Sequence, residues 1–247
     1  MFFSTGFGHD WPCGFSLAAW TANQNLKMLI RRRKHPAKNK LSLSEKAYNH
    51  LVNKLLSREL SPGDIINRRQ VATELRMSVA PVLEAMVQLQ NDGFVESIQR
   101  KGTIVKSIRL EDLRGLVIVR EALEVEAARF FCGPRITQDF DRLRQLAQKL
   151  EDACTQPEIS WKLDFEFHRA LVELAECPAL LSIYDKVMMH KLFLGQNLLV
   201  SVHGGPSHHS HLQLLEELQT RNADKAGQSI RRHIRAGKTV LLNLPEE

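Results

Sequence analysis

The sequence contains little that would place it outside the class of ordinary globular proteins. Its 247 residues include only four cysteines, nine prolines and thirteen glycines, and 43% of the residues are apolar. This composition excludes a disulfide-rich scaffold, a collagen-like chain and a low-complexity disordered chain. The chain also lacks the uninterrupted apolar run of about eighteen residues that a membrane-spanning helix needs. The composition therefore predicts a globular protein without a membrane partner.

The cysteines indicate neither a disulfide framework nor a thiolate metal site. Cys13, Cys132, Cys154 and Cys177 are far apart and show none of the paired spacings of zinc sites or redox motifs. Because disulfides persist mainly in oxidising compartments, this cysteine usage is typical of a reducing one. We therefore expect a cytoplasmic protein.

Positive charge is concentrated in the first half of the chain. Residues 28–106 contain fifteen Lys and Arg against seven Asp and Glu, whereas residues 107–247 contain eighteen against twenty. A basic module of this kind is typical of proteins that meet a polyanion, although a merely solvated basic face has the same composition. The asymmetry predicts two modules, of which only the first faces nucleic acid.

The first forty residues resemble neither module. Residues 1–27 are aromatic and contain glycine, but they have no helical or strand period, and their basic residues follow the apolar part, the reverse of a secretory signal. Met28 precedes the basic stretch RRRK at 31–34, which makes Met28 a candidate start of translation. We predict that residues 1–40 are disordered or form a basic arm that contacts phosphates.

Residues 41–108 show the period of three helices followed by that of a hairpin. Apolar residues at helical spacing fill 42–60 and 67–75, with a Ser-Pro-Gly-Asp turn between them. Ser78 is a suitable N-cap for a third helix, and Gly93 is a suitable residue to end it. The pattern predicts a helix-turn-helix with one supporting helix.

A basic turn follows, between two segments of alternating polarity. Residues 94–98 and 103–108 are predicted to pair as strands around Arg100, Lys101 and Gly102. Three helices and a hairpin are the layout of a winged helix, in which one helix enters the major groove of DNA and the wing lies against the backbone. DNA binding is the favoured interpretation, and a protein-binding winged helix is the alternative.

Residues 47–105 resemble the N-terminal domain of the GntR family of bacterial transcription regulators. The resemblance rests on the motifs LSPGD, NRRQVATEL, PVLEAM, L..DGFV and RKGTIV. In that family the turn and recognition helix usually read Ser-Arg-Thr-Pro-Val-Arg-Glu-Ala-Leu, and the two arginines contact phosphates and base edges. This sequence has Val79, Ala80 and Leu83 there, while Arg69 matches the family's arginine in the preceding helix.

The missing arginines predict an altered operator preference and not a loss of DNA binding. Valine and leucine offer only apolar contact, for example to a thymine methyl group, whereas arginine makes a forked contact with guanine. Arg76 and the stretch 31–34 are further candidates for phosphate contacts. The residues predicted to contact DNA are Arg68, Arg69, Ser78, Val79, Ala80, Leu83, Arg100, Lys101 and Gly102.

Residues 109–243 consist of helical segments with almost no strand pattern. Apolar residues recur every three or four positions in segments that cover 110–131, 137–153, 160–176, 178–201, 208–220 and 223–243. Breaks fall at Gly133-Pro134, Pro157, Cys177-Pro178, Gly204-Gly205-Pro206 and Asn222. This half is predicted to form an antiparallel helical bundle, so the fold class is mainly α, with a winged helix-turn-helix followed by the bundle.

Four polar residues on the apolar faces of three helices form a candidate metal site. Asp164 and His168 are four residues apart and share one helical face, and His211 and His233 share faces with apolar residues of later helices. This set suits a divalent metal of the zinc, nickel or manganese type, with coordination positions left open. Taken singly, each histidine is more commonly a hydrogen-bonded core residue. The other histidines of this half are interpreted as surface or loop residues: His190, His203, His208 and His209.

This half also resembles the FCD ligand-sensing domain of the FadR subgroup of GntR regulators, an all-helical bundle. Many FCD domains bind a metal through an Asp-x-x-x-His pair and two later histidines, and Asp164, His168, His211 and His233 match that pattern one by one. The motif VREALE at 119–124 matches as well. The resemblance implies a metal in this bundle.

The resemblance also implies an effector, because FCD domains usually sense small organic acids that the metal holds by oxygen atoms. Arg120 lies on an otherwise apolar stretch and would form a bidentate clamp on such an acid. An ion pair with Glu124, four residues further on, is the alternative role for this arginine.

The predicted function is a DNA-binding transcription regulator. It would bind a double-stranded operator as a homodimer, and a small organic acid at the metal site would change its affinity for that operator. Two alternatives are a metal-dependent enzyme with Asp164 as base, and a regulator whose bundle only dimerises. The enzyme leaves the basic module unexplained, so we predict no catalytic residues. Neither the effector nor the metal nor the sign of regulation follows from the sequence, although repression is assumed.

Overall fold

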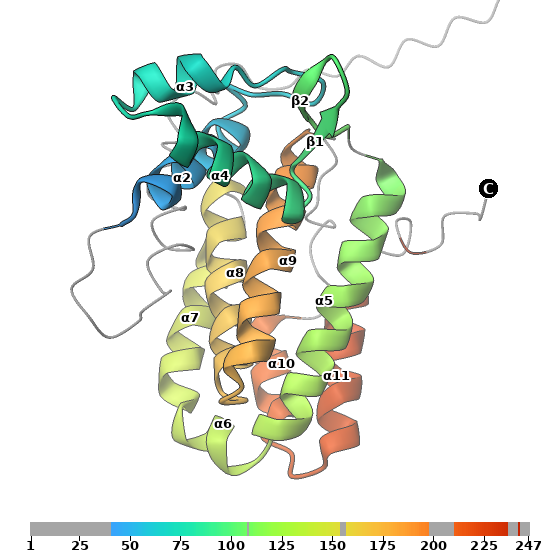
Figure 1. Cartoon of the computed structure of the whole chain (residues 1–247). Helices are drawn as coiled ribbons and strands as arrows, with labels where there is room; N and C mark the ends of the chain where they lie inside the picture. The colour runs from blue at the N-terminus through green and yellow to red at the C-terminus, as the bar shows by residue number, and fades with distance from the viewer. Residues whose placement is uncertain (1–40, 108, 154–156, 198–209, 237–241, 243–247) are drawn as a thin grey trace, which may run out of the picture.

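The computed structural model describes residues 41–107, 109–153, 157–197, 210–236 and 242. In this part of the chain, a small domain with one hairpin sits on the end of a bundle of helices (Figure 1). The described chain is mainly α and has one two-stranded sheet, which confirms the predicted fold class. The predicted N-terminal arm, with its alternative start, lies outside the described residues.

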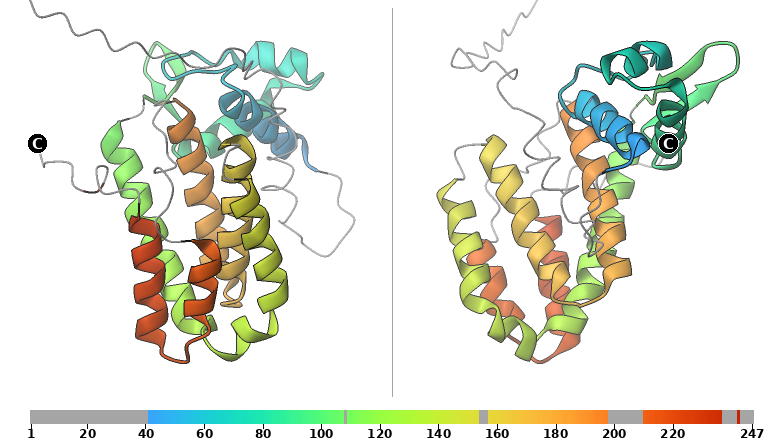
Figure 2. Two further views of the ribbon diagram at one scale, coloured as in Figure 1. Left: turned by 180° about the vertical axis from the view of Figure 1, so that it is seen from behind. Right: turned by 60° about the vertical axis from the view of Figure 1, so that its left-hand side comes forward.

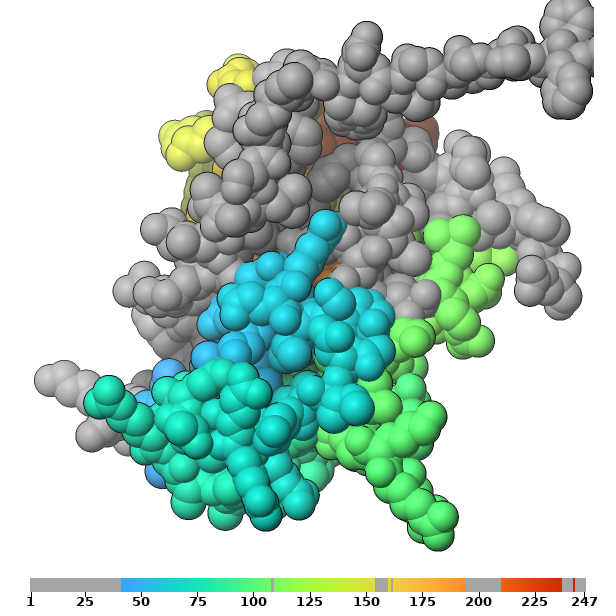
Figure 3. Space-filling view, turned by 90° about the horizontal axis from the view of Figure 1, so that it is seen from above, coloured from blue at the N-terminus to red at the C-terminus, as the bar shows by residue number. Residues whose placement is uncertain are grey.

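The N-terminal domain is a winged helix. Its elements are α2 (Leu43–Leu56), α3 (Arg68–Glu74), α4 (Val79–Asn91), β1 (Val95–Ile98) and β2 (Gly102–Val105). The strands are antiparallel, with Val95 opposite Val105. A bridge between Ile65 and Ile104 ties the segment before α3 to the hairpin. Figure 3 shows this domain end-on, with the hairpin projecting from the helices.

Polar caps determine where the helices of this domain begin. Ser42 and Glu45 form a reciprocal capping box, with hydrogen bonds of 2.8 and 3.1 Å between the side chain of each and the backbone N–H of the other. The side chain of Asn67 accepts a hydrogen bond from the Arg69 N–H and begins α3. Ser78 occupies the N-cap of α4, the predicted position, without a side-chain capping bond.

The predicted inward faces of the three helices form the core of the winged helix. The buried residues from these faces include Ala47, Leu51, Leu55, Leu56, Val71, Val82, Met86 and Leu89. Gly93 ends α4 with φ of +83°, a left-handed conformation that favours glycine. This turn directs Phe94 into the core, where its side chain is 2% exposed.

Seven helices of the described chain follow the wing. They are α5 (Leu110–Phe131), α6 (Pro134–Gln138), α7 (Phe140–Asp152), α8 (Pro157–Glu173), α9 (Pro178–Asn197), α10 (His211–Leu218) and α11 (Ala223–Arg235). Figure 2 shows from two sides that the long helices run alongside one another. The sequence predicted all of them except α6, whose five residues are too few to show a period. None of the described helices combines the length and the apolar character needed to cross a membrane.

Helix α5 is the element against which α8, α9 and α11 all pack. A Cβ atom at Gly227 of α11 would lie 3.1 Å from Cγ1 of Val125, so the absence of a side chain permits the close approach of α11 to α5. Arg235 of α11 also donates to the Glu121 carboxylate of α5, with the shortest distance 2.7 Å. These contacts place His233 of α11 beside α5.

The winged helix rests on α9 of the bundle. The ring of Phe94 lies 4.4 Å from that of His190 and 5.4 Å from that of Phe193, measured between centroids. The interpretation of His190 as a surface residue is therefore wrong, because α9 carries this ring into the contact between the domains. Burial there lowers the pKa of His190.

Polar contacts surround the apolar contact between Phe94 and α9. Asp92, the C-cap of α4, accepts a hydrogen bond of 2.8 Å from the Tyr48 hydroxyl and lies 3.5 Å from Nζ of Lys186 on α9. The preceding residue of α9, Asp185, accepts two hydrogen bonds of 2.7 and 3.0 Å from Arg169 of α8. A cleft of about 280 Å³ opens among these residues, so the two domains are not packed tightly along their whole border.

Candidate functional site

Three histidines from three helices converge inside the bundle. His168 lies on α8, His211 is the first residue of α10, and His233 lies on α11. One nitrogen of each lies within 4.8 Å of the corresponding nitrogens of the other two. His168 and His233 are buried and His211 is largely so. The structure therefore brings together the three histidines that the sequence grouped.

Asp164 lies against this cluster. Its Oδ1 is 3.4 Å from Nε2 of His168 and 3.4 Å from Nε2 of His211. These distances are long for a hydrogen bond, but two ligands held about 2.1 Å from one tetrahedral zinc ion are themselves about 3.4 Å apart. Both Nε2 atoms are buried and have no hydrogen-bond partner. Because unpartnered buried polar atoms are costly, the donor set fits a divalent cation.

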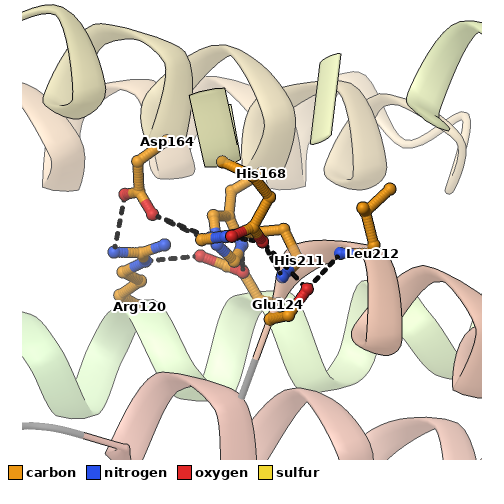
Figure 4. A network of polar contacts seen from close by, with 8 residues as sticks. Arg120, Glu124, Asp164, His168, His211 and Leu212 are labelled. Atoms are coloured by element: carbon orange, nitrogen blue, oxygen red, sulfur yellow. Dashed lines mark hydrogen bonds and ion pairs between the residues drawn. The ribbon is translucent and has the colours of Figure 1, made fainter. Parts of the chain in front are cut away.

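A buried carboxylate orients His168. Glu124 on α5 lies 2.6 Å from Nδ1 of this histidine, and its other oxygen accepts a hydrogen bond of 2.6 Å from Nε of Arg120 (Figure 4). Since an ionised carboxylate only accepts hydrogen bonds, Nδ1 carries the proton of this contact, and Nε2 is the nitrogen that faces Asp164. Such a carboxylate–histidine pair is the usual support of a metal-binding imidazole.

Arg120 links two acidic residues of the site. It is 2% exposed, and its Nη1 lies 3.5 Å from Oδ2 of Asp164 in addition to the bond from Nε to Glu124. The ion pair with Glu124, one of the two roles that the sequence allowed, is therefore present. Figure 4 shows the guanidinium between the two carboxylates, beside the histidines.

The start of α10 fixes the position of His211. Ser210 caps this helix and donates a hydrogen bond of 2.9 Å to Glu151 of α7. The same carboxylate oxygen accepts a bond of 2.8 Å from the backbone N–H of His211 and lies 3.6 Å from its Nδ1. The backbone contact anchors the histidine at a helix end, where it directs Nε2 toward Asp164.

The surroundings of the cluster favour ionised carboxylates and a neutral His233, whereas Asp164 and Glu151 outweigh the effect of burial on His211 and raise its pKa. Burial opposes ionisation of Asp164, but Arg120 and His168 outweigh it and hold the pKa of this carboxyl well below its usual range. Burial likewise opposes ionisation of Glu124, and Arg120 and His168 bring its pKa to about 2. Burial lowers the pKa of His233 well below its usual value. Ionised carboxylates and neutral imidazoles are the forms in which these groups coordinate metals.

A second candidate site covers the outer side of the winged helix. Among the residues predicted to contact DNA, the exposed ones are Arg68, Arg69, Ser78, Ala80, Leu83, Arg100, Lys101 and Gly102. Val79 is instead partly buried and packs against the core. Arg100 and Gly102 both have positive φ, +67° and +101°, so they form a tight turn that exposes the basic tip of the wing.

Two family models match the chain one after the other. The model of bacterial regulatory proteins of the gntR family matches residues 43–105, and the model of the FCD domain matches residues 116–236. The chain belongs to the GntR family. Its winged helix is accordingly a DNA-binding domain, and the protein is a DNA-binding transcription regulator of the GntR type with an FCD domain. Family and relatives are regulators and not enzymes, which removes the enzyme alternative.

Individual relatives agree with this assignment. The chain is 28% identical over 187 residues to the Nta operon transcriptional regulator of Aminobacter aminovorans, which covers 72% of this chain and 85% of the relative. It is 22% identical to the transcriptional repressor RspR of Escherichia coli K12, covering 75% and 85%. A GntR transcriptional regulator of Rhodococcus sp. RHA1 has a similar fold, with a TM-score of 0.63, 18% identity, and coverage of 83% and 100%.

Sequence reasoning missed two residues that support the histidines. Glu124 was considered only as a partner of Arg120, and Glu151 was not considered at all. Each meets its histidine across a separation of 44 or 60 residues, which no local spacing reveals. Glu124 could have been found from its position. It lies four residues after Arg120 on an apolar helix face, so it is expected to be buried.

Proposed function

We propose that this regulator senses a small organic acid through a divalent metal held by Asp164, His168, His211 and His233. The observation that carries the proposal is the pair of buried Nε2 atoms, on His168 and His211, that have no hydrogen-bond partner and lie 3.4 Å from one carboxylate oxygen. Nitrogen ligands with a carboxylate suit zinc, nickel or manganese. Such an ion would supply a Lewis-acid centre that binds acid oxygens.

Arg120 is the residue of this chain proposed to contact the effector. Its guanidinium lies within the same buried group as Asp164, and it has five N–H donors in a fixed fork. Nε is engaged by Glu124 and Nη1 lies 3.5 Å from Asp164, so the acid would bind to the donors that these two contacts leave. In this role Arg120 would bind and orient the acid, while Glu124 holds the arginine and His168 in place.

The proposed output is a change in operator affinity. We infer that the protein acts as a homodimer and a repressor; the name of its relative RspR, a transcriptional repressor, supports the second inference. A dimer binds two half-sites and so multiplies the modest affinity of each winged helix. The acid would act by favouring one placement of the two winged helices over another, which requires different affinities for the two arrangements.

Contacts between the domains supply a physical route for this control. His168 is adjacent in sequence to Arg169, which holds Asp185 of α9 by two hydrogen bonds. The next residue of α9, Lys186, pairs with Asp92 at the end of the recognition helix. A shift of α8 on ligand binding would reach α4 through these two pairs, and the cleft beside them leaves room for the movement.

The experiment is a titration of the full chain onto DNA from its own upstream region, followed by fluorescence anisotropy. Protein stripped with a chelator is compared with protein reloaded with zinc, and the loaded protein is then titrated with a panel of hydroxy and dicarboxylic acids. Because allosteric coupling is typically about 1–3 kcal/mol, we expect at least one acid to change the dissociation constant about fivefold or more.

Two variants make the titration specific. His211→Ala removes a candidate ligand and is expected to abolish the response to metal and acid, whereas His50→Ala changes a surface histidine of α2 and should leave it intact. If the wild type binds DNA equally well with and without metal and with every acid, the bundle serves only to dimerise the protein, and the sensing proposal is wrong.

A further inference from the structure

The recognition helix α4 carries no basic residue. Its sequence, VAPVLEAMVQLQN, contains a single charged side chain, that of Glu84. Its exposed face combines this carboxylate with three apolar side chains at helical spacing, namely Ala80, Leu83 and Val87. Leu83 is 40% exposed and Val87 is 59% exposed, so both offer apolar area to a groove.

The basic side chains of the domain lie on other elements. Arg68 and Arg69 are exposed at the start of α3, and Arg100 and Lys101 are exposed at the tip of the wing. In winged helices these are the places that lie along the DNA backbone. The exposed basic side chains of these elements and the exposed apolar face of α4 therefore lie on different parts of the domain, as expected if the first contact phosphates and the second contacts base edges.

We propose that α4 reads thymine and cytosine and not guanine. Leu83 and Val87 contact the C5 methyl groups of thymine, and Glu84 accepts a hydrogen bond from the N4 amino group of cytosine. The proposal rests on DNA binding by the winged helix and is independent of the metal and the effector. It assigns base specificity to three residues, of which Val87 and Glu84 are new to the DNA-contacting set.

The chemistry of the major groove supports this assignment. Guanine presents two acceptors there, N7 and O6, which a carboxylate cannot satisfy, whereas cytosine presents a donor and thymine a methyl group. A carboxylate near phosphates is repelled unless it meets a donor, and cytosine suits Glu84 better than adenine does, because the amino group of adenine lies beside the N7 acceptor. Burying one methyl group is worth about fourfold in affinity.

The test begins with selection of binding sites from a random duplex library by the full chain. In the selected half-site, each thymine is then replaced in turn by deoxyuridine, which keeps the hydrogen-bonding groups and lacks only the methyl group. Anisotropy titrations at fixed salt should show one or two positions where the replacement weakens binding about fourfold. Leu83→Ala should remove the uracil effect at one of them, and Val87→Ala at the other.

Glu84→Gln provides the second readout. Glutamine reads adenine in the major groove, so this variant should exchange a cytosine preference for an adenine preference in a repeated selection. Glu96→Gln, at an exposed acid on β1, is the matched control and should change neither preference. These variants alter exposed side chains, and circular dichroism verifies that each is folded.

Two results overturn the proposal. The first is a selected site whose affinity is unaffected by uracil at every thymine, or a repeated selection by Glu84→Gln that returns the same half-site as the wild type. The second is the absence of binding to any duplex at low salt, which contradicts DNA binding itself and with it this assignment. The two are distinguishable, because only the first leaves a sequence-specific complex.

Discussion

The bundle buries charge, and the winged helix does not. Among the described residues, every buried polar or charged side chain lies in the bundle, including Arg120, Glu124, His168 and His233. The buried residues of the winged helix are apolar, apart from the hydroxyl of Tyr48, which bonds to Asp92. The winged helix exposes its candidate functional groups, whereas the bundle buries most of its own.

The difference fits DNA binding by the winged helix and the binding of a small ion or acid that we propose for the bundle. DNA is a large polyanion that stays in solvent, so a reader needs exposed cations and an exposed helix face, and its core is free to be apolar. A small ion or acid gains most from a site that excludes water, where charge interactions are strong. The cost is desolvation of the charges, which only a fully paired arrangement offsets.

The largest effect on stability is expected from Arg120→Met, in the buried site of the bundle. The change leaves Glu124 and Asp164 without their cation in a buried site, so we expect the free energy of unfolding to fall by about 3–5 kcal/mol. Urea denaturation of the chelator-treated protein measures this change. Arg129→Met removes an exposed ion pair with Asp224 and should leave the free energy of unfolding almost unchanged. If both variants lowered the free energy of unfolding equally, burial would not make the loss of Arg120 more costly, and this prediction would be wrong.

Glu124→Gln tests what the buried charge of this residue contributes to metal binding, because it keeps the shape of the site and removes one charge. Glutamine can still meet Nδ1 of His168, but it holds the ring in the correct tautomer less strongly, and zinc affinity should fall about 10–100-fold. Isothermal titration calorimetry gives the value. Glu126→Gln, on the exposed side of the same helix, serves as the matched control. An unchanged affinity would mean that Glu124 only balances Arg120.

Asp92→Asn tests whether the two regions act together. The variant keeps a hydrogen-bond acceptor for Tyr48 and removes the ion pair with Lys186 of the bundle. We expect metal affinity to stay unchanged while the effect of metal on DNA affinity falls by about threefold, within the range of allosteric coupling energies. Anisotropy titrations with and without zinc give the ratio. A full metal response in the variant would remove this contact from the proposed route.

The smallest effect concerns a surface pair of the winged helix. A hydrogen bond from Lys54, aided by one from His50, lowers the pKa of Glu74 to about 2. Because the folded pKa lies below the unfolded one, this stabilisation is present above about pH 4.5 and is lost as the pH falls toward 2. Partial exposure limits it to about 0.5–1 kcal/mol. Unfolding curves of wild type and Glu74→Gln should therefore differ at pH 6 and converge near pH 2.

The sequence predicted much of the fold because the local patterns are strong. The period of α5 gives both of its ends, at Leu110 and Phe131, and Gly93 marks the end of α4. The same reasoning grouped Asp164 with the histidines, because helical spacing says which side chains face inward. It failed for α6, which is too short to have a period.

Contacts between distant segments were beyond local patterns. His190 packs against Phe94, almost one hundred residues earlier in the chain, and a helical position alone does not show whether another domain covers it. The support of His168 by Glu124 was missed for the same reason. Ionised residues on an inward helix face still give a partial prediction. Their burial requires a partner, even when the sequence does not say which residue it is.

The most direct test of the account is the metal content of the bundle. Chelator-stripped full-length protein is titrated with zinc, nickel and manganese, and binding is followed by calorimetry and by elemental analysis after dialysis. We predict one ion per chain for the wild type and at least a hundredfold weaker binding for His168→Ala and for His211→Ala, the latter being the less buried ligand. A wild type that binds none of the three ions, or variants that bind them equally well, would contradict the account.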